Sequence, residues 1–432
     1  MVDKIKYKMT LTELKNKSSL IASAGLAAFL LYFSMYAFRK PFAVGTFQGY
    51  ELWGVNYKIV LIIAQVIGYT LSKFIGIKVI SEVKKERRPW LIISFILLAE
   101  LALLGFGLVK APYNFIFLFL NGLPLGMIWG LVFSYLEGRS VTEILATILS
   151  ASFIMASGVT KAVGKYLMLN YSISEFWMPF FTGLVFLIPL FIAVWWLEKI
   201  PEPTEDDKKL RKERLPMTKE DKKKLFWGLF PGLTALIVMY LFLTAFRDYR
   251  DNFTAEIWIE TGFKNNAAIF AKTETYIAII ALSILALFVF IKNNLKAVRT
   301  MLLVMIIGLF SVAIATYLFE QYNAISPFVW MTIVGLGAYI AYIPLGSMLF
   351  DRIIASLKYK GNAGFLIYIA DAIGYVGSIA VLLYKEFFFK GTSILEFFIK
   401  FTYVTFFFGI TGLIIAYFYF SKLFKEQENA KI

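Results

Sequence analysis

Ionisable side chains interrupt several long apolar segments of the chain. Seven of them stand out: Arg39, Lys40, Lys73, Lys161, Arg247, Glu274 and Asp371. A charge inside a membrane-spanning segment costs roughly 3 kcal/mol unless it is paired or hydrated, so each marks a candidate functional site. Five cations against two carboxylates leave a surplus of positive charge that requires an anion to compensate it. These residue types therefore predict a site for a small anionic ligand.

Arg39 and Arg247 are the leading candidates for holding that anion. They end two apolar segments that occupy corresponding places in the first and second halves of the chain. Two guanidinium groups facing each other can grip one tetrahedral oxyanion through paired hydrogen bonds. The alternative is that each arginine only marks the outer end of its helix.

Three tyrosines and two lysines are candidates to support the two arginines in binding the anion. Tyr32, Tyr36 and Arg39 follow helical spacings of four and three, so they share one side of a helix that either lines a cavity or packs against lipid. Lys40 follows directly. Tyr69 and Lys73 also share a helix face and can present a phenol and an ammonium to one ligand, unless Lys73 extends toward the membrane surface.

Lys161, Asp371 and Glu274 are candidates for gating or coupling. Lys161 and Asp371 lie in segments that internal symmetry brings near the centre, where an ion pair between the halves would act as a gate, although Lys161 can equally pair within its own half. Glu274 can exchange a proton if it is buried, or it can simply neighbour Lys272. Arg250 and Asp251 are expected in an outer loop, joined by a local salt bridge.

The composition indicates that these residues are carried by membrane helices. Of the 432 residues, 59% are hydrophobic and 17% are charged, far from the balance of soluble domains. Twelve apolar windows of about 20 residues predict twelve transmembrane helices. The windows are 18–40, 57–80, 90–109, 113–136, 144–169, 177–198, 226–247, 267–291, 299–319, 326–349, 362–385 and 394–420.

The two halves of the chain carry similar sequence features in the same order. The residues that end the first window, Tyr36 to Arg39, and the seventh, Thr244 to Arg247, are offset by 208 residues. Gly122 and Gly335, in the fourth and tenth windows, are offset by 213. The sequence therefore predicts an all-α membrane protein of the major facilitator type, with two pseudo-symmetric six-helix bundles. Glycine and proline in the fourth and tenth windows are expected to allow close helix approach and bending.

Charge distribution sets the predicted boundaries and orientation. Basic residues gather in the first tail, in the loop near Lys84 and between residues 208 and 224, which places both termini in the cytoplasm. The predicted parts are a tail (1–17), a first bundle (18–198), a charged linker (199–225), a second bundle (226–420) and a second tail (421–432). The net charge of +15 thus reflects contact with lipid and not with nucleic acid.

The residue types that the chain lacks exclude several kinds of functional site. The chain contains no Cys and no His, so disulfides, thiol nucleophiles and the usual metal ligands are excluded. It shows no nucleophile and base pair and no nucleotide-binding loop. We therefore expect neither an enzyme nor a bound metal or cofactor, and we expect a monomer.

Three stretches resemble the organophosphate:phosphate antiporter family, which includes glycerol-3-phosphate and hexose-phosphate transporters. The first-helix pattern of that family is similar to Tyr32, Tyr36 and Arg39-Lys40. Its second-helix pattern is similar to the run from Tyr69 to Phe74, which includes Lys73. Arg247 is similar in position to the second phosphate-binding arginine of the family. The resemblance implies a bacterial inner-membrane antiporter that exchanges an organic phosphate for inorganic phosphate by alternating access. It also implies phosphate binding by Arg39 and Arg247, supported by Lys40, Lys73, Tyr32, Tyr36 and Tyr69.

Two departures leave alternatives open. The family has a histidine in its fifth helix, where this chain has Ser157 and Gly158, and the loop after the second window lacks the usual Asp-Arg signature. The chain can thus belong to a branch that has kept the anion-binding residues but binds a different ligand. A proton-coupled transporter of another solute and a transporter-like sensor of phosphorylated metabolites also remain possible.

Overall fold

The part of the chain that the structure describes contains twelve helices of 18 residues or more. The structure is a computed structural model, and it describes residues 11–137, 139, 141–204, 207, 219–356 and 363–429. The long helices are α1 (Leu11–Met35), α2 (Tyr57–Glu82), α3 (Arg88–Leu108), α4 (Phe115–Leu136), α5 (Thr142–Tyr171), α6 (Met178–Glu198), α9 (Phe230–Asn252), α11 (Ala268–Ala286), α12 (Asn294–Tyr322), α13 (Pro327–Pro344), α15 (Ala363–Phe388) and α16 (Ile394–Asn429). Eleven of them, all except α15, contain segments long and apolar enough to cross a membrane.

Short elements connect and extend the long helices. These are the 3₁₀ turns η1 (Tyr36–Phe38), η2 (Pro41–Val44), η3 (Lys85–Arg87) and η4 (Leu287–Phe290), the hairpin of β1 (Glu51–Leu52) and β2 (Val55–Asn56), the helices α8 (Lys219–Gly228), α10 (Thr254–Glu260) and α14 (Phe350–Ser356), and the π-helix η5 (Leu345–Leu349). β1 and β2 pair antiparallel, with Glu51 opposite Asn56. The helix starts follow local sequence: Asn56, Asn293 and Ser326 accept hydrogen bonds at the first turns of α2, α12 and α13.

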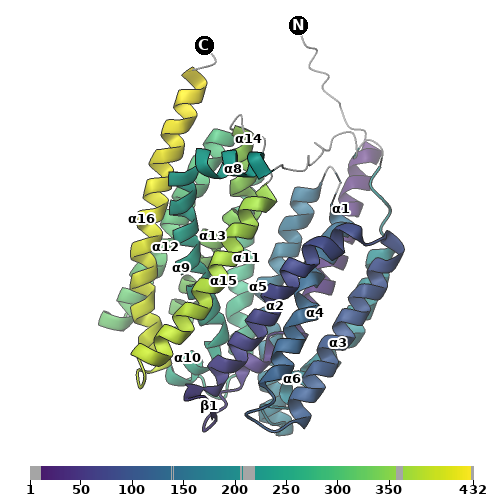
Figure 1. The fold of residues 1–432 in the computed structure, drawn as a ribbon, viewed down its shortest axis with the longest axis vertical. Coiled ribbons are helices and arrows are strands. Elements are labelled where there is room, and N and C mark those ends of the chain that lie inside the picture. Colours follow the sequence, from purple (N-terminus) through teal and green to yellow (C-terminus); the bar gives the residue numbers. More distant parts are fainter. Residues whose placement is uncertain are drawn as a thin grey trace.

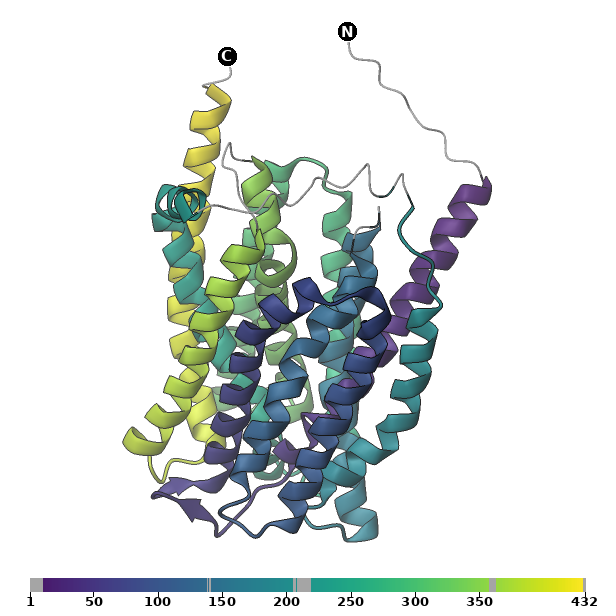
Figure 2. The same cartoon turned by 45° about the vertical axis from the view of Figure 1, so that its right-hand side comes forward.

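The helices divide into two bundles that lie side by side. In Figures 1 and 2, α1 to α6 form one bundle, from purple to teal, and α9 to α16 form the other, from teal to yellow. The first turn of α1 and the last turn of α16 lie at the same end of the molecule, and β1 and α10 lie at the opposite end. We call these the terminal end and the hairpin end. The chain is therefore an all-α membrane protein with two six-helix bundles, as predicted.

Glycines allow the closest approaches between helices. A Cβ atom added at Gly122 of α4 would lie 2.4 Å from the carbonyl oxygen of Gln65 in α2, and one at Gly158 of α5 would lie 2.5 Å from the carbonyl oxygen of Phe270 in α11. Both distances are shorter than van der Waals contact, so a side chain cannot fit without moving backbone. Gly122 packs helices of one bundle, whereas Gly158 packs one bundle against the other.

Several predicted boundaries differ from those of the structure. α1 begins at Leu11, inside the predicted tail, and α16 continues to Asn429, beyond residue 420. Leu, Lys and Glu are good helix formers, so these polar ends continue the helix after hydropathy has fallen. Residues 205, 206 and 208–218 of the predicted linker, and residues 1–10, lie outside the described residues.

The predicted bend in the tenth window is a π-helix. α13 ends at Pro344, and η5 follows from Leu345 to Leu349 before α14 begins. Proline removes a backbone N–H donor and disturbs the hydrogen bonds of the preceding turn, which explains why the regular α-helix ends there. Gly346, Ser347 and Met348 of this π-helix line the central cavity described below.

Candidate functional site

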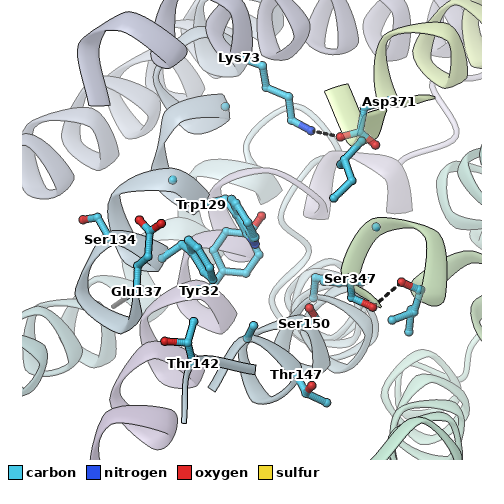
Figure 3. A pocket seen from close by; sticks show the side chains of 18 of the residues that line it. Tyr32, Lys73, Trp129, Ser134, Glu137, Thr142, Thr147, Ser150, Ser347 and Asp371 are labelled. Atoms are coloured by element: carbon cyan, nitrogen blue, oxygen red, sulfur yellow. Dashed lines mark hydrogen bonds and ion pairs between the residues drawn. The ribbon is translucent and has the colours of Figure 1, made fainter. Parts of the chain in front are cut away.

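A cavity of about 1210 Å³ lies between the two bundles. Its deep end is formed by Arg39, Lys40 and Asp251, and its rim at the terminal end by residues such as Arg139 and Arg352. Among the described residues, none of those lining the cavity belongs to the hairpin or to α10. The cavity therefore extends to the loops of the terminal end, and the described hairpin and α10 are not part of its lining. Figure 3 shows part of its wall, with Tyr32 and Trp129 from the first bundle and Ser347 and Asp371 from the second.

Arg39 projects into this cavity from the turn that ends the first helix. It directly follows η1 as the C-cap residue, and Lys40 then precedes η2, which begins at Pro41. Its guanidinium carbon lies 3.8 Å from the centre of the Tyr69 ring and 6.0 Å from that of Tyr36, within the range of cation–π attraction. Within the described part of the chain no carboxylate forms an ion pair with Arg39, and its buried Nε has no hydrogen-bond partner.

Arg247 lines the same cavity from the opposite bundle. Its guanidinium carbon lies 3.9 Å from the centre of the Tyr342 ring on α13, so the two arginines have matching aromatic supports. Unlike Arg39, Arg247 donates to a carboxylate: its Nη2 lies 2.7 Å and its Nε 3.2 Å from Oδ1 of Asp248. The sequence pattern revealed the two arginines but not this difference between them.

Tyr32, Tyr36, Tyr69, Lys40 and Lys73, the predicted supporting residues, all line the cavity. The alternative that Lys73 extends toward the membrane surface is wrong. Its Nζ donates to Asp371 Oδ2 at 2.9 Å and to the Tyr375 hydroxyl at 3.1 Å, both on α15 of the other bundle. Figure 3 shows this ion pair across the cavity.

Asp371 is thus paired with Lys73, and the predicted ion pair between Lys161 and Asp371 does not form. Asp371 also accepts a hydrogen bond from Tyr240 at 2.6 Å. Lys161 lies 2.6 Å from Asp251 Oδ1 and is almost fully buried, so it does not line the cavity. Internal symmetry placed both residues near the centre, but the rotation of each helix selects different partners.

Asp251 is the centre of a buried cluster that joins the bundles. It forms ion pairs with Lys161 and with Lys40, and it accepts a hydrogen bond from Ser157 at 2.5 Å. The expectation that Asp251 and Arg250 lie in an outer loop is wrong, because α9 continues to Asn252 and both side chains are buried. Buried partners compensate these charges, so the helix continues beyond the point where hydropathy falls.

Glu274 does not reach the cavity either. It pairs with Arg250 at 2.8 Å within the second bundle, and both side chains are at most 7% exposed. The partner of Glu274 is therefore Arg250 and not Lys272, the neighbour that the sequence offered as an alternative. In the structure Lys272 instead lies 5.1 Å from the centre of the Phe328 ring.

Further contacts between the bundles lie at the hairpin end. Lys58, at the start of α2, is 2.5 Å from Glu256 of α10 and donates to the carbonyl oxygen of Ala43 at 2.8 Å. The backbone N–H of Asn56 donates to Glu386 of α15 at 3.0 Å. These residues, which sequence reasoning missed, bring the bundles together where the cavity is closed.

The cavity carries more positive than negative side chains. Among the described residues, eight cationic and six acidic side chains line it. The central acids are Asp248, Asp251 and Asp371, of which only Asp371 was predicted. The signal for the other two was the alternation of charge from Arg247 to Asp251 directly after an apolar window. In the described part of the chain no group of three or more acidic side chains could hold a metal ion.

Comparisons with known proteins agree with this architecture. Similar solved structures are a D-xylose–proton symporter (15% identity, TM-score 0.59, covering 93% of this chain and 97% of that chain) and the nucleoside transporter NupG (13%, 0.61, 92% and 98%). A third is the xylose transporter XylE from E. coli in an inward open conformation (16%, 0.53, 93% and 95%). No curated protein matches the sequence.

At these identities the structural matches establish the fold alone. At the level of sequence, residues 41–423 match a family described as a family of unknown function (DUF5690). The chain therefore has the major facilitator fold and belongs to the DUF5690 family.

Proposed function

We propose that this protein is a secondary transporter that exchanges a small organic phosphate for inorganic phosphate by alternating access. The major facilitator fold places a substrate site near the middle of the membrane between two bundles. Here a cavity with a positive surplus lies between the bundles, and its lining includes Arg39 from one bundle and Arg247 from the other. On the predicted topology the open terminal end faces the cytoplasm.

One observation carries the proposal: Arg39 points into the cavity without a carboxylate partner among the described residues. A guanidinium that is partly removed from water needs a compensating anion, and its planar fork matches two oxygens of a phosphate. Stacking on Tyr69 holds the guanidinium plane in place. The free cation is therefore prepared for an oxyanion brought by the substrate.

Counterflow in proteoliposomes tests this function. Vesicles containing the purified protein are loaded with unlabelled phosphate, and uptake of labelled phosphate is followed. We expect uptake that Arg39→Gln reduces by at least about a hundredfold, since a charged hydrogen bond to the substrate is lost, and that Arg39→Lys restores only in part. Arg299→Gln is the matched control, because Arg299 bonds to Ser421 away from the cavity.

A screen of thermal stability with sugar phosphates, glycerol phosphate, phosphate and carboxylates would identify the organic substrate. If ligands stabilise the protein but no counterflow occurs, the protein is a sensor and the transport proposal is wrong. If neither stabilisation by phosphates nor counterflow is observed, phosphate is not the ligand.

A second candidate is a proton-coupled transporter of a cation or a neutral solute. It is favoured by Asp248, Asp251 and Asp371, three carboxylates that line the same cavity. Charge reversal separates the two candidates. If Arg39→Glu and Arg247→Glu retain transport while Asp371→Asn abolishes it, the anion proposal is wrong.

A further inference from the structure

We propose that Asp248 determines the charge of the substrate by acting as an internal counter-ion of Arg247. This inference rests on the proposed function of the cavity as an anion site. In this view the two arginines are not equivalent: Arg39 receives the anionic group directly, whereas Arg247 already holds a carboxylate that the substrate must displace.

The geometry shows that the Asp248 carboxylate is held through both oxygens. Oδ1 accepts from Nη2 and Nε of Arg247, at 2.7 and 3.2 Å. Oδ2 accepts from the hydroxyl of Ser378 on α15, at 2.9 Å. The side chains of Arg247 and Asp248 are 16% and 15% exposed, and both line the cavity. A carboxylate in this position occupies the same guanidinium atoms that a phosphate would use.

The ion pairs near the two arginines show where the positive surplus of the site lies. Lys73 and Asp371 compensate each other, and so do Arg247 and Asp248. Lys40 and Lys161 share the single carboxylate of Asp251. The excess charge is therefore concentrated at Arg39 and the adjoining cluster around Lys40, in the first bundle. An anion entering the cavity is attracted to this side first.

A fixed negative charge at Asp248 acts more strongly on a ligand of higher charge. Electrostatic energy is proportional to the ligand charge, so the repulsion of a dianion is twice that of a monoanion at the same place. Asp248 should therefore disfavour dianions relative to monoanions. Removing its charge should tighten dianion binding by the square of the factor found for a monoanion.

Binding to the purified full-length protein can measure this ratio. At pH 8, methyl phosphate is mostly a dianion, because the second pKa of a phosphate monoester is about 6, whereas dimethyl phosphate is a monoanion. With Asp248→Asn we expect the Kd of methyl phosphate to fall about tenfold, equivalent to roughly 1.4 kcal/mol, and that of dimethyl phosphate to fall about threefold. Glu320→Gln is the matched control, since it removes an exposed carboxylate of α12 that binds Tyr403.

Two further variants keep the test decisive. Asp248→Ser is a second neutral variant, and Asp248→Glu retains the charge and should retain the wild-type preference. Unchanged or weaker binding of both phosphates by the neutral variants would overturn the proposal, because Asp248 would then only position Arg247. Failure of both neutral variants to fold would overturn it as well, since Asp248 would be a structural residue.

The outcome for the wild type separates this inference from the function on which it rests. If the wild type binds neither phosphate and shows no counterflow, the proposed function fails. If the wild type exchanges phosphate while Asp248→Asn leaves the ratio of the two Kd values unchanged, only the role of Asp248 fails.

Discussion

The two ends of the cavity use their charges differently. At the closed hairpin end, buried ion pairs join the bundles: Lys58 with Glu256, and Lys40 and Lys161 with Asp251. At the open terminal end, two polar contacts each lie within one half of the chain. Lys85 pairs with Glu202, and Arg352 donates to Asn294. A few buried pairs therefore hold the bundles together at one end, whereas the Lys85–Glu202 pair at the rim is largely exposed.

Among the substitutions considered, loss of the Asp251 carboxylate should have the largest effect on the contrast between the closed and the open end. Asp251→Asn leaves the buried ammonium groups of Lys40 and Lys161 without their shared carboxylate, and breaking a buried pair costs about 3–5 kcal/mol. We expect the hairpin end to open and exchange to be lost. Because the chain has no cysteine, single cysteines can report this opening.

Ala255→Cys, on the buried face of α10, reports on the hairpin end, and Ser347→Cys reports on the cavity. In detergent, maleimide should label Ala255→Cys slowly, and at least about tenfold faster when Asp251→Asn is added. Labelling of Ser347→Cys should change little. Equal labelling of Ala255→Cys with and without Asp251→Asn would show that Asp251 does not hold this end closed.

Loss of Lys58 should have an intermediate effect. Lys58→Met leaves Glu256 without its ion-pair partner, and we expect a loss of about 2 kcal/mol of stability because Glu256 retains some access to water. Thermal unfolding of the purified protein measures it. Lys400→Met, which breaks an exposed pair with Glu396, is the control. Adding Glu256→Gln to Lys58→Met should recover most of the loss, and no recovery would argue against the ion pair.

Loss of Lys85 should have the smallest effect. Its pair with Glu202 at the rim is largely exposed, with side-chain exposures of 45% and 64%. Exposed pairs contribute about 0.5 kcal/mol, so Lys85→Gln should leave thermal unfolding nearly unchanged. A decrease as large as that of Lys58→Met would contradict the distinction between the two ends.

Hydropathy and internal symmetry predicted the fold and part of the site. Long apolar windows are sufficient to identify membrane helices, because a helix is the structure that satisfies its own backbone in lipid. The offset between the halves placed Arg39 and Arg247 correctly on one cavity. Their aromatic partners, Tyr69 and Tyr342, come from other helices, and only Tyr69 stood out in the sequence.

The pairing of the charges was not predictable by the same means. Hydropathy ended the seventh window at Arg247, so Arg250 and Asp251 were assigned to a loop, although buried partners keep them helical. Lys161 and Asp371 were both placed near the centre, but which carboxylate meets which lysine depends on helix rotation. A sequence pattern gives the face of each helix and not its rotation against a neighbour.

The close approach at Gly158 limits how the two bundles can move. There the backbone of α5 lies against the carbonyl oxygen of Phe270 and the side-chain carbons of Glu274, both on α11. Sliding of α5 along α11 would drive larger neighbouring residues into that narrow gap, whereas a rocking motion about the gap would leave it almost unchanged. This contact can therefore act as a pivot, and a bulky residue at position 158 would block it.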